Sequence, residues 1–254
     1  YVPTFDKDAG SKTTYQYLKM FLKKGYVVKF LGDNFLHEEP YSTTLQQMGI
    51  EVLYGDDYAA GIWDWLKTNG DQINYAYLNR PHIAAKYVDY IKDYTKMKVI
   101  YYGHDLHFLR LGREYELTGD IHIKREADYW KSVELTMMHK AAVSYYPSYV
   151  EINAIHAIDG SIHAKAITAY VYDTFLSNIQ DDFAKREGLL FVGGFAHPPN
   201  ADAVLWFARE IFPAIRKRIP GIRFYVVGSK VTGEIQALGQ EEGIVIKGFV
   251  SEEE

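Results

Sequence analysis

The 254-residue sequence contains no cysteine. Disulfide bonds, thiolate zinc sites and a cysteine nucleophile are therefore excluded. The formal net charge is −5, so the chain as a whole offers no basic surface for nucleic acid. No apolar run approaches the length of a membrane span, and the first residues do not read as a signal peptide. We expect a cytoplasmic protein that does not bind nucleic acid.

Several nucleotide and metal motifs are also missing. No G-x-G-x-x-G occurs, which weakens a dehydrogenase interpretation. Gly10-Ser-Lys12 resembles the end of a P-loop, but Phe5 stands where the earlier glycine belongs. The spacing of His104 and His107 could put both on one helical face, yet no recognised pattern supplies a third ligand. We therefore expect neither a metal nor a cofactor.

The composition is that of an ordinary globular protein, with 48% hydrophobic and 24% charged residues and room for two domains. Tyrosine is abundant, at 22 residues. These rings could stack against a sugar, or they could be core and strand residues. The second explanation is the better one for most of them.

Short apolar runs alternate with helical patterns through the first two thirds of the chain. This alternation predicts a parallel sheet with helices on both faces, in an N-terminal Rossmann-like domain over residues 1–172. The expected strands cover residues 27–31, 50–54, 75–78, 99–102, 142–146 and 163–168. Asp6–Thr14 is expected to be a polar loop that leads into the first helix.

The polar stretch of residues 173–187 is expected to be an interdomain linker, and a second α/β set follows over residues 188–254. The apolar run Leu189–Val192 predicts a strand covered on both faces. A helix is expected over residues 201–218, capped by Asn200 or Asp202, with unpaired N–H groups available to an anion. The pattern stops after three strands, about half of a doubly wound domain. Both ends read as cut, so we expect a piece of a longer polypeptide.

In open parallel sheets, ligands bind beyond the carboxyl ends of the strands. Polar and glycine residues follow the predicted strands in phase, and they are the candidate site residues. They are Gly10, Ser11, Lys12, Asn79, His82, His104, Asp105, Gly193, Gly194, His197, Ser229, Lys230, Gly248 and Phe249.

His104 and Asp105 are the candidate catalytic pair. The histidine could donate a hydrogen bond to a substrate hydroxyl or phosphate, and Asp105 could orient it or accept a proton. The alternative is a histidine that only buttresses its loop. His197, between a glycine pair and two prolines, could likewise reach a phosphate or sugar, or only pin its loop.

The chain resembles retaining glycosyltransferases of the GT-B architecture, in the group 1 or family 4 class. The C-terminal residues that carry the match are Phe191-Val-Gly-Gly-Phe-Ala-His-Pro-Pro-Asn-Ala-Asp-Ala203, Trp206-Phe207, Phe212-Pro-Ala-Ile215, Phe224-Tyr-Val-Val-Gly-Ser229 and Gly248-Phe-Val250. A looser match covers Val2-Pro-Thr4, Asp8-Ala-Gly-Ser11 and Tyr102-Gly-His-Asp105.

The resemblance implies metal-free transfer of a sugar from a nucleotide-sugar to a glycan or glycoconjugate acceptor, with retention at the anomeric carbon. Helix dipoles and basic side chains would stabilise the leaving diphosphate. The Gly10 loop and the Gly193-Gly194 turn would lie near the diphosphate or the acceptor. His104 would contact the donor sugar, and Gly248 and Phe249 would lie near the nucleobase.

The sequence also departs from the family pattern. The family's two glutamates, spaced eight apart, are not in this chain, and Lys230 is the only candidate for the usual basic pair. Two other functions stay open: a sugar-nucleotide epimerase of the same architecture, and a non-catalytic scaffold. Many members of the group build polysaccharide at the inner face of a membrane, so peripheral membrane contact is a further expectation. An open sheet edge in a half-built domain would favour self-association.

Overall fold

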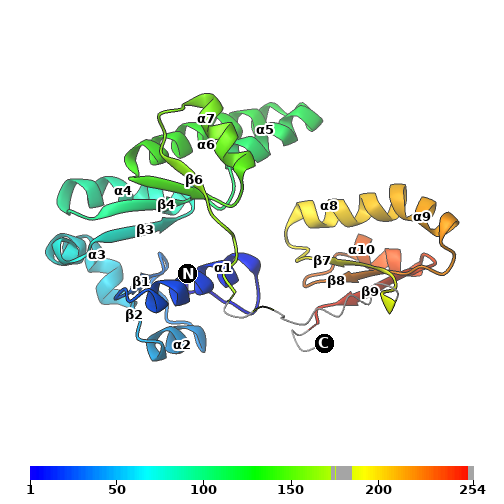
Figure 1. Ribbon diagram of the computed structural model, residues 1–254, viewed down its shortest axis with the longest axis horizontal. Helices are drawn as coiled ribbons and strands as arrows, with labels where there is room; N and C mark the ends of the chain where they lie inside the picture. Colours follow the sequence, from blue (N-terminus) through cyan, green and yellow to red (C-terminus); the bar gives the residue numbers. More distant parts are fainter. Residues whose placement is uncertain (173–174, 176–184, 251–254) are drawn as a thin grey trace. The chain divides into compact units, whose positions relative to one another are not determined.

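The computed structural model describes residues 1–172, 175 and 185–250. The chain divides into two compact units, Tyr1–Asp173 (unit 1) and Thr174–Glu254 (unit 2). Each unit has its own parallel strands and its own helices (Figure 1). The predicted linker, residues 173–187, lies mostly outside the described residues.

Unit 1 contains seven α-helices and six strands within its described residues. The helices are α1 (Ala9–Lys23), α2 (Tyr41–Gln47), α3 (Asp56–Asn69), α4 (Pro81–Tyr94), α5 (His107–Thr118), α6 (Ile121–Lys140) and α7 (Tyr149–Ile158), with a 3-10 turn, η1 (Gly70–Gln72). The strands are β1 (Lys29–Leu31), β2 (Glu51–Leu53), β3 (Tyr75–Asn79), β4 (Lys98–Tyr102), β5 (Val143–Tyr146) and β6 (Ala164–Ala166).

All strand pairs of unit 1 are parallel, which confirms the predicted α/β class. The strands form two sheets instead of the single one expected. One sheet has the order β3-β4-β5-β6, and β1 and β2 pair separately. In the larger sheet Asn79 lies opposite Tyr102, so β3 and β4 end side by side. Their two following loops therefore begin at the same edge.

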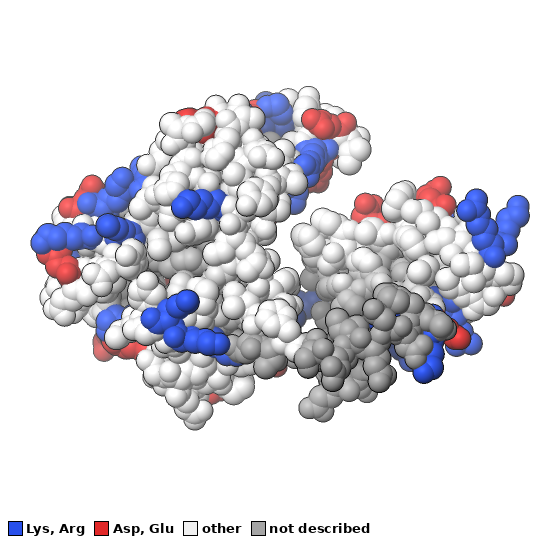
Figure 2. Space-filling model, in the orientation of Figure 1, with Lys and Arg blue, Asp and Glu red and all other residues white. Residues whose placement is uncertain are grey.

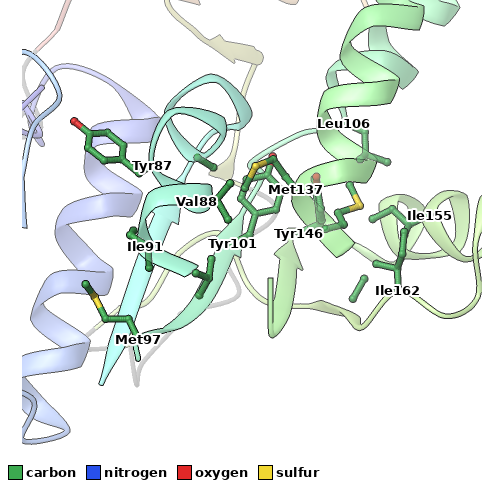
Figure 3. Close-up of a cluster of buried hydrophobic side chains, with 14 of the residues drawn as sticks. Tyr87, Val88, Ile91, Met97, Tyr101, Leu106, Met137, Tyr146, Ile155 and Ile162 are labelled. Carbon is green, nitrogen blue, oxygen red and sulfur yellow. The ribbon is translucent and has the colours of Figure 1, made fainter. Parts of the chain in front are cut away.

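Helices cover both faces of the larger sheet, as predicted. Tyr101 and Tyr102 are neighbours on β4 and point to opposite faces, yet they are only 0% and 1% exposed. Tyr101 belongs to a core cluster with Val88 of α4 and Met137 of α6, and Figure 3 shows these side chains together. On the other face, the Tyr102 ring lies 5.8 Å from the Tyr17 ring of α1. These tyrosines are core residues.

Helix α1 begins earlier than the sequence pattern indicated. The Asp8 carboxylate accepts a hydrogen bond from the Ser11 backbone N–H at 2.8 Å and caps the helix, so the first turn starts at Ala9. The predicted loop Asp6–Thr14 is therefore wrong beyond Asp8. Its polar composition reflects capping and an exposed helix face.

Unit 2 contains one parallel sheet of order β7-β8-β9 within its described residues. Its strands are β7 (Leu189–Val192), β8 (Phe224–Val227) and β9 (Ile244–Gly248). Its helical segments are α8 (Pro198–Trp206), the π-turn η3 (Phe207–Ile211), α9 (Phe212–Arg218), α10 (Gly233–Ala237) and η4 (Leu238–Gln240). A single core joins them through Val204, Phe212, Val226 and Ile235.

Two expectations for unit 2 are wrong. The helix over residues 201–218 starts at Pro198 and is interrupted by the π-turn, where Pro213 provides no N–H for a regular α-helical bond. Strand β7 is covered on one face only, because Leu190 and Val192 are 67% and 68% exposed. A continuous apolar run does not reveal whether the second face has a partner.

Candidate active site

The loops after β3 and β4 meet at the carboxyl edge of the unit 1 sheet. The Arg80 backbone N–H donates to the Tyr102 carbonyl at 3.0 Å, which joins the two loops. The His104 Nε2 atom lies 3.2 Å from Asn79 Oδ1. The structure thus brings together two predicted site residues, Asn79 at the end of β3 and His104 in the loop after β4.

His104 is held as a neutral ring in a strained backbone. Its φ of 67° is in the left-handed region, which non-glycine residues seldom adopt. Burial, followed by the nearby Arg80 charge, lowers the pKa of His104 to about 4. Since Asn79 Oδ1 can only accept, His104 Nε2 donates the hydrogen bond, and Nδ1 of the neutral ring remains an acceptor. No described residue donates to that Nδ1.

Asp105 does not orient His104. Its carboxylate accepts a hydrogen bond from Arg110 Nε at 3.3 Å and lies 3.7 Å from His107 Nδ1. The expectation that His104 and His107 share a helical face is also wrong, since α5 begins at His107 and His104 lies before it. Asp105 therefore contacts residues in the first turn of α5, and Asn79 is the hydrogen-bond partner of His104.

A fully buried carboxylate holds the first two residues of α5 in place. Glu134 of α6 is 0% exposed, and its two oxygens accept the backbone N–H groups of His107 and Phe108, each at 3.1 Å. Its carboxylate lies 3.4 Å from His107 Nδ1, and this side-chain interaction raises the pKa of His107. Beneath the same loop, a Cβ added to Gly103 would lie 2.3 Å from ring atoms of Tyr146. The loop that carries His104 is thus closely packed from below.

Arg80 is a candidate site residue that the sequence pattern did not single out. It follows β3 directly, with a left-handed φ of 66°, and its Nη2 atom would lie 3.0 Å from a Cβ added to Gly10. Its charge contributes to lowering the pKa of His82 and of His104. The available signal was its place between two predicted site residues, Asn79 and His82, just before Pro81.

The three predicted residues of the Gly10 loop lie in the first turn of α1. Gly10 adjoins Arg80. Ser11 is buried, and its hydroxyl donates to Asp8 Oδ2 at 2.6 Å, so it completes the helix cap instead of facing an open site. The Lys12 backbone N–H donates to the Asp8 carbonyl at 3.0 Å. The structure places Gly10 beside another candidate group, the Arg80 guanidinium.

In unit 2, glycines join the carboxyl ends of the strands. The Gly193 N–H donates to the Val227 carbonyl at 3.0 Å, and the Phe195 N–H donates to the Ser229 carbonyl at 3.0 Å. A Cβ added to Gly228 would lie 1.8 Å from the Gly193 carbonyl oxygen, which no side chain could tolerate. Gly194 and Ser229 adjoin each other across this junction, since an added Gly194 Cβ would lie 3.6 Å from Ser229 Oγ.

The start of α8 differs from the expected anion site. Its first two residues are Pro198 and Pro199, which have no N–H, and the Asn200 N–H donates to the His197 carbonyl at 3.0 Å. The Asn200 side chain donates to the Gly194 carbonyl at 2.9 Å, so it steadies the turn instead of capping the helix. His197 is exposed and its backbone N–H donates to Gly194 at 3.2 Å. Because the two prolines have no N–H, the start of α8 offers an anion few hydrogen-bond donors.

The remaining predicted residues of unit 2 lie on the same edge. Lys230 is exposed, has a left-handed φ of 56°, and makes no ion pair with the described residues. Gly248 has a φ of 70°, and its carbonyl accepts from the Gly228 N–H at 2.8 Å. Phe249 follows with 66% of its surface exposed. An exposed cation and an exposed aromatic ring thus follow β8 and β9.

Among the described residues, no group of three or more His, Cys, Asp or Glu side chains could hold a metal ion. No helix within residues 1–172 or 185–250 is long and apolar enough to cross a membrane.

Comparison with known proteins connects unit 2 to one family. Residues 186–254 match the family described as "Glycosyl transferases group 1". No curated protein matches the chain. The matched residues contain the whole β7-β8-β9 sheet and the Gly193, Lys230 and Phe249 loops. Residues 186–254 are therefore similar to the group 1 glycosyltransferases, and the parallel α/β sheets of the chain fit a GT-B glycosyltransferase.

Proposed function

We propose that the protein transfers a sugar from a nucleotide-sugar donor to a glycan or glycoconjugate acceptor, with retention at the anomeric carbon. The neutral, partly buried His104 is the observation on which this proposal chiefly depends. It lies at the carboxyl edge of a parallel sheet, where ligands of such sheets bind, and its Nδ1 is free to accept a hydrogen bond. The nucleotide-sugar donor and the retention of configuration are proposed on the basis of the group 1 family match of unit 2.

His104 and Asn79 would together orient a donor-sugar hydroxyl. Asn79 fixes the tautomer, so Nδ1 presents a lone pair to the hydroxyl proton. Because the pKa of His104 is about 4, the ring stays neutral at pH 7 and keeps that lone pair. The sequence interpretation assigned His104 a donor role; the hydrogen bond to Asn79 favours an acceptor role instead.

Unit 2 would hold the nucleotide. Lys230 would neutralise part of the charge that develops on the leaving diphosphate, and the exposed Phe249 ring would stack on the nucleobase. Ser229, Gly193 and Gly194 would line the nucleotide site between Lys230 and Phe249.

Three of the four left-handed non-glycine residues in the described chain lie in candidate-site loops; they are Arg80, His104 and Lys230. Such strain is concentrated at functional sites in proteins generally.

Turnover of nucleotide-sugars tests the proposal. The protein is incubated with UDP-, GDP-, ADP-, CDP- and dTDP-sugars and candidate glycans, and release of nucleoside diphosphate is measured. We expect release from one donor class, and a roughly tenfold lower rate in His104→Asn, about the value of one lost hydrogen bond. His122→Asn, an exposed histidine on α6, is the matched control and should retain the rate.

The product's anomeric configuration, read by NMR, tests retention separately. Inversion would contradict the retaining mechanism but not the transfer. Interconversion of the donor sugar without transfer would show an epimerase instead. No turnover of any donor, with or without acceptor, would contradict the proposed activity.

A further inference from the structure

Arg80 is held in a fixed orientation at the carboxyl edge of unit 1. Its N–H donates to the Tyr102 carbonyl at 3.0 Å, and its own carbonyl accepts from the Ala84 N–H at 2.9 Å. The residue thus connects the end of β4 to the first turn of α4. These two bonds hold the backbone in the left-handed conformation and fix the direction in which the side chain leaves it.

The guanidinium lies against Gly10. An added Cβ at Gly10 would be 3.0 Å from Arg80 Nη2, which is tighter than an ordinary contact. The absence of a side chain at position 10 therefore leaves room for the arginine. The same cation influences His82 and His104, since its charge contributes to lowering the pKa of each.

Arg80 makes no ion pair with the described residues; the nearby Asp8 carboxylate, whose Oδ1 would lie 3.3 Å from the same added Gly10 Cβ, is hydrogen-bonded to Ser11 instead. The carboxylates on the neighbouring loops are engaged elsewhere. Asp8 accepts from the Ser11 N–H and hydroxyl, Asp33 from Lys86 Nζ and Tyr87 OH at 2.6 Å each, and Asp105 from Arg110. Both histidines beside Arg80 have pKa values below the ordinary one, so they are neutral at pH 7 and add no competing charge. A partly buried arginine with neutral hydrogen-bonding neighbours has the properties of an oxyanion receptor.

We propose that Arg80 binds an acidic group, carboxylate or phosphate, on the sugar acceptor. This inference rests on the proposed function and adds the class of acceptor to it. The planar guanidinium offers paired N–H donors that match either oxyanion. The acceptor is the chosen source because the proposed function already assigns the donor diphosphate to Lys230 of unit 2, so the anion at Arg80 of unit 1 is a separate one.

Histidine-ring NMR of the protein provides the test without a known acceptor. Inorganic phosphate, glucuronate and neutral glucose are titrated at constant ionic strength and pH 7, and the ring signals of His82 and His104 are followed. We expect saturable shifts with phosphate and glucuronate and none with glucose. Bound anion should also raise the pKa of both histidines, because it favours their charged forms.

Variants at position 80 make the result specific. Arg80→Gln should weaken phosphate and glucuronate binding roughly tenfold or more, since it removes charge-assisted hydrogen bonds. Arg80→Lys, which keeps the charge and the same backbone demand, should retain part of the affinity. Arg125→Gln removes the same charge from an exposed position on α6 and should bind as the wild type does.

Nucleoside diphosphates distinguish the acceptor from the donor. If Arg80 serves the acceptor, Arg80→Gln should bind UDP, GDP, ADP, CDP or dTDP with unchanged affinity. Loss of nucleoside diphosphate binding in this variant would assign Arg80 to the donor diphosphate and overturn the acceptor assignment. Equal phosphate and glucuronate binding by wild type and Arg80→Gln would overturn the anion site itself, while leaving nucleotide-sugar turnover as the separate test of function.

Discussion

At the scale of single residues, His104 should make the stability of unit 1 depend on pH. Its pKa of about 4 in the folded protein lies below its ordinary value, so the unfolded chain binds the proton more readily. The free energy of unfolding should therefore fall as the pH decreases from about 6.5 to about 4, by on the order of 3 kcal/mol from this residue. Above pH 6.5 the residue adds no pH dependence.

Urea unfolding of wild type and His104→Asn at several pH values checks this. Asparagine tolerates the left-handed backbone, so the variant should fold. The wild type should lose more stability than the variant between pH 6.5 and 4, and the two should run parallel above that window. Parallel curves throughout would contradict the buried neutral ring.

At Gly228 the neighbouring backbone leaves no room for a side chain. Gly228→Ala would place a methyl group 1.8 Å from the Gly193 carbonyl oxygen, a backbone atom that cannot rotate away. We expect a loss of about 3 kcal/mol in unfolding free energy, at the upper end for overpacking. Gly233→Ala in the same unit, with nothing within 4 Å of its added Cβ, is the control and should change stability little. Equal effects in both variants, measured by denaturant unfolding, would contradict the close approach.

Single-residue features were the least predictable from the sequence. The predicted strand ends placed Asn79 and His104 correctly at one edge of the sheet, because parallel strands end at the same edge. Nothing in the residue types indicated that Arg80 and Lys230 would have left-handed backbones, a conformation typical of glycine or asparagine. The residue types also could not show that Asp105 pairs with Arg110, since this pairing depends on where α5 begins.

At the scale of elements, the exposed face of β7 leads to a prediction. Leu190 and Val192 point away from the unit 2 core, where Leu189 and Phe191 pack on the opposite face. Leu190→Thr and Val192→Thr should each change the unfolding free energy by no more than about 0.5 kcal/mol, as expected of exposed positions. They should also reduce self-association, because they remove exposed apolar surface.

Light scattering and urea unfolding of the double variant test both parts. Phe191→Thr, on the covered face, is the control and should destabilise unit 2 clearly. Strong destabilisation by the double variant would show that Leu190 and Val192 are buried in solution. Unchanged light scattering at high protein concentration would show that this face does not mediate association.

The elements themselves were largely predictable. Every predicted strand is present within a few residues, because short apolar runs between turn residues are a strong local signal. Helix starts were harder. The Asp8 cap and the Pro198-Pro199 start show that a capping side chain or a proline pair can begin a helix several residues before its apolar face becomes visible.

At the scale of the whole molecule, the small net charge of −5 is accompanied by a mixture of positive and negative side chains on the surface. On the side drawn in Figure 2, Lys and Arg side chains lie among Asp and Glu side chains on unit 1. The division into two α/β units follows from the alternation of strands and helices, which the sequence shows plainly. The separation of β1-β2 from β3–β6 depends on which strand edges meet, and composition does not encode that.

Nucleoside diphosphate binding tests most directly the proposal that unit 2 is a nucleotide-sugar donor domain. The melting temperature is measured with UDP, GDP, ADP, CDP and dTDP, for the wild type and for Lys230→Gln. Ligand at one hundred times its Kd stabilises a protein by about 2.7 kcal/mol, a shift of several degrees in Tm. We predict a saturable rise with one nucleotide that is smaller in Lys230→Gln. No rise with any of the five at millimolar concentration would contradict the claim.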